Sequence, residues 1–283
     1  MKTMGRDNMK RILILFVFII SFVFSGLRVC AENIKFAQIS DAHISTDSEY
    51  SQKVLKSAVE DINSQVDISF VVFTGDQINS PSEDNLRTFI SIAKRLKIPY
   101  YIVVGNHDVY KNKKMSKARY FEILREGNPF YRQRTPNYKF TKNGFVFLTV
   151  DGAKEVIPGS IGYYRKDTLD WVDQMLTKNS KNSVIILQHF PVEYPDGVEN
   201  KLKTHRTYKV EEYQKILEKH TNVLAVLSGH FHVNSENMKN GVYHISSPSI
   251  INMPNSYKVI DIITTKDFSP LIYTQLREFE VKE

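Results

Sequence analysis

Apolar and polar positions alternate along the chain with two different periods. Short apolar runs, which are typical of buried strands, are separated by stretches in which apolar residues recur every three or four positions, as on one face of a helix. Strands that alternate with helices favour an α/β domain. The expected strands are residues 34–39, 68–73, 100–104, 138–140, 145–150, 183–187, 223–227, 241–245, 257–263 and 271–275, and the expected helices are residues 54–62, 89–96, 117–125, 169–176 and 208–217.

The later strands add antiparallel pieces to this alternation. Lys142, Asn143 and Gly144 lie between two apolar runs and predict a hairpin. Two packed sheets sandwiched between helices would accommodate this many strands in one domain. No linker rich in Pro, Gly or Ser divides the chain after residue 31. We therefore expect residues 32–283 to form a single domain.

The first 31 residues depart from the pattern. Residues 12–24 are almost entirely apolar, basic residues precede them, and Cys30 and Ala31 follow. This order is typical of a secretory signal peptide cleaved after Ala31, and the apolar core is shorter than the ~20 residues of a spanning helix. The sequence therefore predicts export, with the protein secreted or held in the cell envelope. An uncleaved membrane anchor is the alternative, and Arg28 argues against lipidation at Cys30.

Cleavage would change the chemistry of the mature chain. The whole chain has a formal net charge of +7, and residues 1–31 hold five Lys/Arg against one Asp, so their removal leaves +3. Such a mild charge argues against nucleic acid as a partner. Cys30 is the single cysteine, so the mature chain could form no disulfide. Its stability must come from the core or from bound metal.

Side chains that bind metals recur where the predicted strands end. The carboxyl ends of parallel strands share one edge of a sheet, so these side chains could converge on one cleft. Each cluster alone could be an ordinary turn or a structural histidine. The clusters are Asp41 with His43, Asp76 after Gly75, Asn106-His107-Asp108 after Gly105, His189, and His230 with His232 after Gly229.

The joint occurrence of these clusters favours a metal centre. Asp41 and His43 stand two positions apart, and such residues face the same way on an extended chain. His230 and His232 repeat the spacing, and neighbouring imidazoles suit a metal ion but repel each other when protonated. Nitrogen and oxygen ligands without cysteine favour divalent Zn, Mn or Fe, and a carboxylate can bridge two ions. The remaining histidines are assigned to the surface or the core: His205, His220 and His244.

In this order, the clusters resemble those of the calcineurin-like metallophosphoesterase superfamily, in the phosphodiesterase-type branch that includes class III cyclic nucleotide phosphodiesterases. The resemblance covers residues 41–232. It implies a four-layer α/β/β/α sandwich of two mixed sheets flanked by helices, with two divalent metal ions (Mn, Fe, Zn or similar) in the cleft. It also implies the ligands: Asp41, His43 and His232 for one ion, Asn106, His189 and His230 for the other, and Asp76 as the bridge.

The resemblance implies a reaction as well. A hydroxide that bridges the ions attacks a small phosphomonoester or phosphodiester, because two ions ~4 Å apart neutralise the phosphoryl oxygens and lower the pKa of water. His107 is not a ligand in that family and would protonate the leaving alkoxide as a general acid. Two alternatives stay open: a nuclease with the same motifs, and a non-catalytic surface binding protein that keeps the metal site.

Several nearby residues have less defined roles. Phosphoprotein phosphatases of the superfamily usually carry an aspartate three residues after the bridging one. This chain has Asn79 there, whose amide oxygen could accept a hydrogen bond from the His107 imidazole. We expect Asp108 to orient its loop. Residues 111–134 hold eight Lys/Arg against two Asp/Glu and form either a cationic rim at the cleft or a solvated surface. Further residues could line the cleft, without an assigned role: Tyr194, His205 and Tyr208.

Overall fold

The strands that the apolar pattern predicts build two large sheets. The computed structural model describes residues 32–265 and 269–282, which belong to one compact unit, Glu32–Glu283. The predicted signal peptide, residues 1–31, lies outside the described residues. Within the described ranges, no helix combines the length and the apolar character needed to cross a membrane.

The first sheet has five strands in the order β13-β12-β1-β2-β3. β1, β2 and β3 are parallel, with Ala37 opposite Val71 and Val71 opposite Tyr100, so all three end at the same edge of the sheet. β12 and β13 continue the sheet on the other side of β1 as antiparallel strands. The strands are β1 (Ile34–Ile39), β2 (Val71–Thr74), β3 (Tyr100–Val103), β12 (Ser256–Ile263) and β13 (Leu271–Glu278).

The second sheet has six strands in the order β10-β11-β9-β7-β5-β4. The central strands β5, β7, β9 and β11 are parallel, and the predicted hairpin pairs β4 with β5. The edge strand β10 was not predicted, because its polar sequence lacks an apolar alternation. The strands are β4 (Tyr138–Lys142), β5 (Phe145–Val150), β7 (Val184–Gln188), β9 (Val223–Ser228), β10 (Ser235–Lys239) and β11 (Val242–Ser246).

Aromatic side chains fill the space between the two sheets. Phe36 of β1 stacks on Phe70 with ring centroids 4.7 Å apart, and both rings meet Phe147 of β5 edge to face. Tyr101 of β3 stacks on Phe140 of β4. Such pairs bury large apolar areas in a fixed geometry. The packing therefore fixes how the two sheets face each other.

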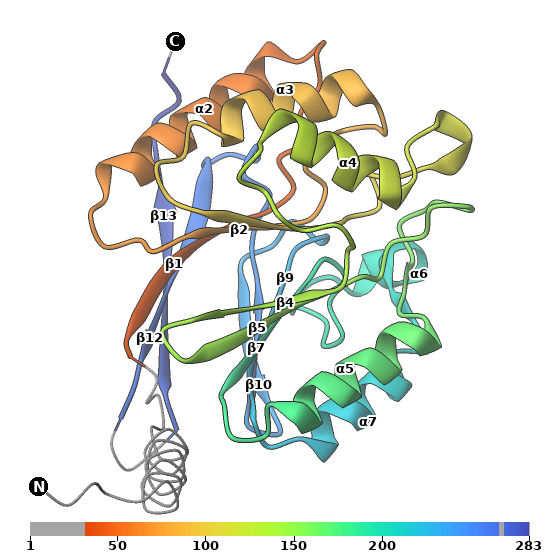
Figure 1. The fold of residues 1–283 in the computed structure, drawn as a ribbon, viewed down its shortest axis with the longest axis vertical. Helices are drawn as coiled ribbons and strands as arrows, with labels where there is room; N and C mark the ends of the chain where they lie inside the picture. The colour runs from red at the N-terminus through yellow and green to blue at the C-terminus, as the bar shows by residue number, and fades with distance from the viewer. Residues whose placement is uncertain (1–31, 266–268, 283) are drawn as a thin grey trace, which may run out of the picture. The chain divides into compact units, whose positions relative to one another are not determined.

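Helices cover the outer face of each sheet and complete the expected four layers (Figure 1). α2, α3 and α4 lie over the first sheet, and α5 and α7 lie over the second. The buried residues of α2 include Val54, Leu55 and Ala58, which belong to the predicted helical stripe. The helices are α2 (Glu49–Ser64), α3 (Glu83–Ala93), α4 (Lys117–Gly127), α5 (Lys166–Lys178) and α7 (Val210–Lys219).

Local signals shift some boundaries from those that the pattern predicts. α2 and α3 begin earlier, because the Ser48 and Ser82 side chains cap their first turns. Residue 208 was expected in a helix, but Tyr208 belongs to a short strand and Lys209 has a φ of 51°, so α7 begins at Val210. Short elements that were not predicted are η1 (Lys111–Lys113), η2 (Glu199–Lys201), α6 (Leu202–His205), and β6 (Gly162–Tyr163), which pairs with β8 (Thr207–Tyr208).

Candidate metal centre

The five predicted clusters meet at one edge of the sandwich. The loops after β1, β2 and β3 carry the clusters of the first sheet, and the loops after β7 and β9 carry those of the second. The parallel strands of each sheet end there, as the sequence led us to expect. The loops surround a cavity of 170 Å³ that is lined by His43, Asp76, Asn106, His107, Ser160, Lys201, His205, His230 and His232.

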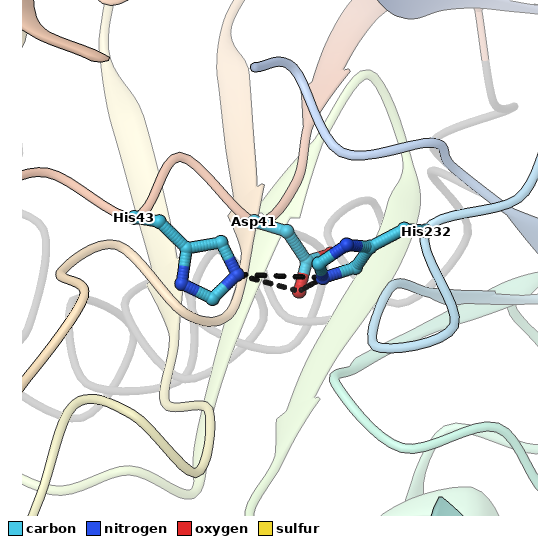
Figure 2. A group of neighbouring side chains, drawn as sticks. All are labelled: Asp41, His43 and His232. Atoms are coloured by element: carbon cyan, nitrogen blue, oxygen red, sulfur yellow. Dashed lines mark hydrogen bonds and ion pairs between the residues drawn. The ribbon is translucent and has the colours of Figure 1, made fainter. Parts of the chain in front are cut away.

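Asp41, His43 and His232 form the first group of potential ligands (Figure 2). The Nε2 atoms of His43 and His232 lie 3.3 Å apart, and His232 Nε2 lies 3.2 Å from Asp41 Oδ1. Ligand atoms bound to one ion at ~2.0–2.2 Å are separated by about 3–3.5 Å. Two of the three separations fall in this range, and the third, from His43 Nε2 to Asp41 Oδ1, is 4.0 Å. The three side chains therefore surround a position that one ion could occupy.

The two oxygens of Asp41 make different contacts. Oδ1 faces His232, whereas Oδ2 accepts hydrogen bonds from Ser40 Oγ and from the His230 main-chain nitrogen. Burial favours the neutral acid, but the hydrogen bond with His232 and the charges of His232 and His189 together outweigh it and lower the pKa of Asp41 to about 2. One oxygen thus remains available to a cation while the other holds the two loops together.

His189 is the centre of the second group, which also contains Asp76, Asn106 and His230. His189 Nε2 lies 3.3 Å from Asp76 Oδ2 and 3.2 Å from Asn106 Oδ1. On the other side of the ring, Nδ1 donates a hydrogen bond to the Thr74 main-chain oxygen at 2.8 Å. A neutral imidazole carries one N–H, so its Nε2 lone pair faces two oxygen lone pairs. A metal ion or a proton bound between these atoms would satisfy all three lone pairs.

Hydrogen bonds to main-chain oxygens also define the state of His230. Its Nε2 donates to the His205 oxygen at 3.0 Å, which leaves Nδ1 as the nitrogen with a free lone pair. Burial and the neighbouring His189 lower the pKa of His230 to about 3. Burial also acts against a charged His189, but Asp76 outweighs it and raises the pKa of His189 to about 9. A proton on His189 thus satisfies the same acceptors that a metal ion would satisfy.

Asp76 lies between the two groups. A carboxylate oxygen of Asp76 lies within 4.8 Å of a ring nitrogen of His189 and of one of His230. The same limit holds between Asp76 and the ring nitrogens of His43 and His107. Its Oδ1 accepts a hydrogen bond from the His107 main-chain nitrogen at 2.8 Å. His189 lowers the pKa of this buried carboxyl despite the opposing effect of burial. The residue is therefore placed to contact ions on both sides.

The backbone turns sharply at most of these positions. The expectation that Asp41 and His43 share a face because the chain is extended is wrong, since both residues have left-handed dihedral angles. Left-handed backbone costs of order 1–3 kcal/mol at a residue with a side chain and persists where the surrounding structure enforces it, often at functional sites. The positive φ angles are 52° at Asp41, 44° at His43, 51° at Asp76, 72° at His230 and 59° at His232.

His107 is held by the main chain and not by an amide side chain. Its Nδ1 donates to the main-chain oxygen of Asn79 at 2.7 Å, so the expected role of the Asn79 amide is wrong. Asp108 orients the loop, as expected: its carboxylate accepts hydrogen bonds from the Gly105 nitrogen at 2.7 Å and the Ile78 nitrogen at 3.1 Å. Burial raises the pKa of Asp108 to about 8. The loops after β2 and β3 are thereby joined.

Of the two alternatives for residues 111–134, the cationic rim is not seen, because none of these residues lines the cavity. Lys111 pairs with Glu155, and Arg119 pairs with Glu83, so both charges are compensated. Among the described residues, the ammonium group at the cavity is that of Lys201.

Of the three residues that could line the cleft by their place in the sequence, His205 does so, and its assignment to the surface or core is wrong. Tyr194 and Tyr208 line a separate pocket. The cavity contacts of Ser160 and Lys201 were not predicted, because no motif surrounds these residues. The short elements η2 and α6 bring Lys201 and His205 to the cavity.

The fold and this geometry define a metal-dependent phosphoric ester hydrolase, and the comparisons with known proteins agree. The sequence model of the calcineurin-like phosphoesterase family matches residues 34–234, and the chain belongs to that family. Its members are generally dinuclear metal enzymes, and the two groups of potential ligands suit such a centre.

Individual relatives are distant but cover most of the chain. A probable glycerophosphodiester phosphodiesterase of Arcobacter nitrofigilis is 24% identical over 75% of this chain and 77% of its own. A probable cyclic nucleotide phosphodiesterase of Moraxella catarrhalis is 27% identical over 69% of this chain and 70% of its own. The crystal structure of a dimetal phosphatase from Danio rerio has a TM-score of 0.64 at 18% identity, covering 87% of this chain and 96% of that one. The last match supports the fold.

Proposed function

We propose that this protein hydrolyses a small phosphomonoester or phosphodiester at a centre of two divalent metal ions, such as Mn, Fe or Zn. The observation that carries the proposal is the shared position of Asp76 between two sets of converging lone pairs. In this proposal Asp76 would help to hold both ions. The other residues that would hold them are Asp41, His43 and His232 for one ion and Asn106, His189 and His230 for the other.

The bound ions would neutralise the phosphoryl oxygens and make a nucleophile available from water near neutral pH. His107 then serves the leaving group. Its Nδ1 is engaged by the Asn79 carbonyl, so Nε2 is the nitrogen that can hold a proton for the leaving alkoxide. The hydrogen bond from the His107 main chain to Asp76 ties this proton donor to the bridging carboxylate.

A small substrate suits the cavity. Its volume of 170 Å³ is below the ~300–1,000 Å³ of typical ligand pockets, so it can hold a phosphoryl group but not a large ligand as a whole. The names of two relatives, a glycerophosphodiester phosphodiesterase and a cyclic nucleotide phosphodiesterase, support a small phosphodiester. The mild charge expected of the mature chain argues against a nuclease.

We also propose that the protein is exported, on the strength of residues 1–31 alone. The apolar segment, the basic residues before it and Ala31 after it support cleavage by a signal peptidase. Fractionation of cells that express the whole chain, followed by N-terminal sequencing, tests this proposal. A mature protein that begins at Glu32 outside the cytoplasm supports it, and an intact chain in the cytoplasm contradicts it.

The substitution Asp76→Asn tests the metal centre most directly. It preserves shape but removes the charge shared by both groups, so we expect loss of bound metal and a fall in hydrolysis of bis(4-nitrophenyl) phosphate by at least about 1,000-fold. Asp47→Asn is the control, because Asp47 is an exposed carboxylate outside the cavity. Metal content by mass spectrometry and initial rates are measured together. A purified protein that binds no divalent metal, or an Asp76→Asn variant with normal rates, would show that the proposal is wrong.

A further inference from the structure

Residues 199–208, here called the strap, lie along one side of the cavity. Its main chain is fixed at three points: the His205 oxygen accepts from His230, the Thr204 oxygen accepts from Ser160 at 2.6 Å, and the Arg206 oxygen accepts from the Gly162 nitrogen at 3.1 Å. The end of the strap pairs with β6. The strap is therefore bound both to the loop that carries His230 and His232 and to the segment that contains Ser160 and Gly162.

Lys201 brings a positive charge from the strap to the cavity. Its Nζ donates to the main-chain oxygen of Phe231, which lies between the two histidines, at 3.1 Å. An ammonium group has three donors, so two remain after this contact. In the described part of the chain, no carboxylate forms an ion pair with Lys201, although it lines the cavity together with His107. Its charge is thus available to a ligand of the cavity.

Lys203 provides the contrast within the same segment. It lies two residues further along the chain on α6 and, although it is exposed like Lys201, it lines a different pocket beside Tyr194 and Tyr208. The two lysines share charge, size and neighbourhood, but only Lys201 borders the cavity that holds His107. A difference in activity between variants of the two lysines therefore indicates contact with the substrate.

We infer that Lys201 binds a non-bridging oxygen of the substrate phosphoryl group and sets the preference between monoesters and diesters. This inference rests on the proposed function of the same cavity. Coulomb energy is proportional to charge, so an ammonium group attracts a doubly charged phosphomonoester about twice as strongly as a singly charged diester. Lys201 accordingly shifts selectivity towards the monoester.

The test compares Lys201→Gln, Lys201→Arg and Lys203→Gln in the full chain loaded with Mn²⁺. The substrates are 4-nitrophenyl phosphate and bis(4-nitrophenyl) phosphate at pH 8, where the monoester is a dianion since its second pKa is about 6. Loss of a charged hydrogen bond should lower kcat/KM of Lys201→Gln about 30-fold for the monoester and about fivefold for the diester. Lys201→Arg should recover most of the selectivity, and Lys203→Gln should match the wild type. Unchanged metal content in all variants would exclude a structural effect.

Equal losses for both esters in Lys201→Gln, or no loss for either, would overturn the inference. Binding of inorganic phosphate to the Mn²⁺-loaded protein, measured by calorimetry, separates this outcome from failure of the proposed function. If the wild type hydrolyses neither ester, the proposed function is wrong, and the phosphate titration alone then decides the role of Lys201. A dissociation constant at least about tenfold higher in Lys201→Gln than in Lys203→Gln supports phosphate recognition, and equal constants overturn it.

Discussion

The two sheets contribute different chemistry to the same cavity. The loops of the first sheet carry both carboxylates, Asp41 and Asp76, together with the Asn106 amide and two imidazoles, those of His43 and His107. The loops of the second sheet carry only imidazoles, of which His189 and His230 are each fixed by a hydrogen bond to a main-chain oxygen. The negative charge that would attract metal ions therefore comes from one sheet, and preoriented neutral donors come from the other.

This difference shows why neither sheet makes a site alone. His189 lies 3.3 Å from Asp76, and His232 lies 3.2 Å from Asp41, so each group of ligands is held together by a contact that joins one sheet to the other. The loop junction is also tight. A Cβ atom at Gly75, in the first sheet's loop, would lie 2.2 Å from His189 Nδ1. The aromatic packing between the sheets thus determines the geometry of the ligands.

The largest expected effect distinguishes histidines that bind metal from the histidine that acts in catalysis. His107→Ala should keep bound metal but lower kcat by about 10²–10⁴-fold, because a general acid contributes that much to hydrolysis. His189→Ala, on the second sheet, should lose metal as well as activity, since it removes a lone pair between Asp76 and Asn106. Metal analysis and rates on bis(4-nitrophenyl) phosphate check both variants. Loss of metal in His107→Ala would show that His107 is a metal ligand and not only a general acid. That result would weaken the contrast between the two sheets.

A smaller effect is expected where the two sheets touch. Gly75→Ala introduces a Cβ that collides with the His189 ring at a residue whose φ is 101°. Strain and overpacking together should lower the free energy of unfolding by about 3–4 kcal/mol and weaken metal binding.

The matched control for this junction is Gly241→Ala. Gly241 also has a positive φ, of 79°, but no atom lies within 4 Å of the added Cβ. Its cost should be about 1 kcal/mol, from the backbone alone. Urea denaturation with and without Mn²⁺ measures both. Equal destabilisation of the two variants would contradict the role of Gly75 in bringing the sheets together.

The smallest effect concerns Asn79. Because its main-chain oxygen accepts the hydrogen bond from His107, Asn79→Ala should change kcat by less than about twofold, within the range of a neutral surface substitution. The pH dependence of kcat should also stay the same. A tenfold loss of kcat in this variant would indicate that the amide side chain, and not the main-chain oxygen, holds His107.

Most of the fold follows from the apolar pattern. The run at residues 34–39 coincides with β1, and the stripe at residues 54–62 lies on the buried face of α2. Elements with little apolar signal could not be predicted in this way. β10 is a polar edge strand, and η2 and α6 are short segments that are fixed by contacts with distant loops. Such contacts depend on tertiary packing, which leaves no periodic trace in a sequence.

The sequence by itself determined which side chains follow the strands and the class of chemistry that they suit. The tertiary structure decided how they meet: the left-handed turn at Asp41, the carbonyl of Asn79 beside His107, and the place of Lys201 in the cavity. The physical reason is that main-chain oxygens are the same at every residue, so a sequence cannot tell which of them accepts a hydrogen bond. That choice depends on the packing of the two sheets, which brings residues far apart in the chain within reach of one another.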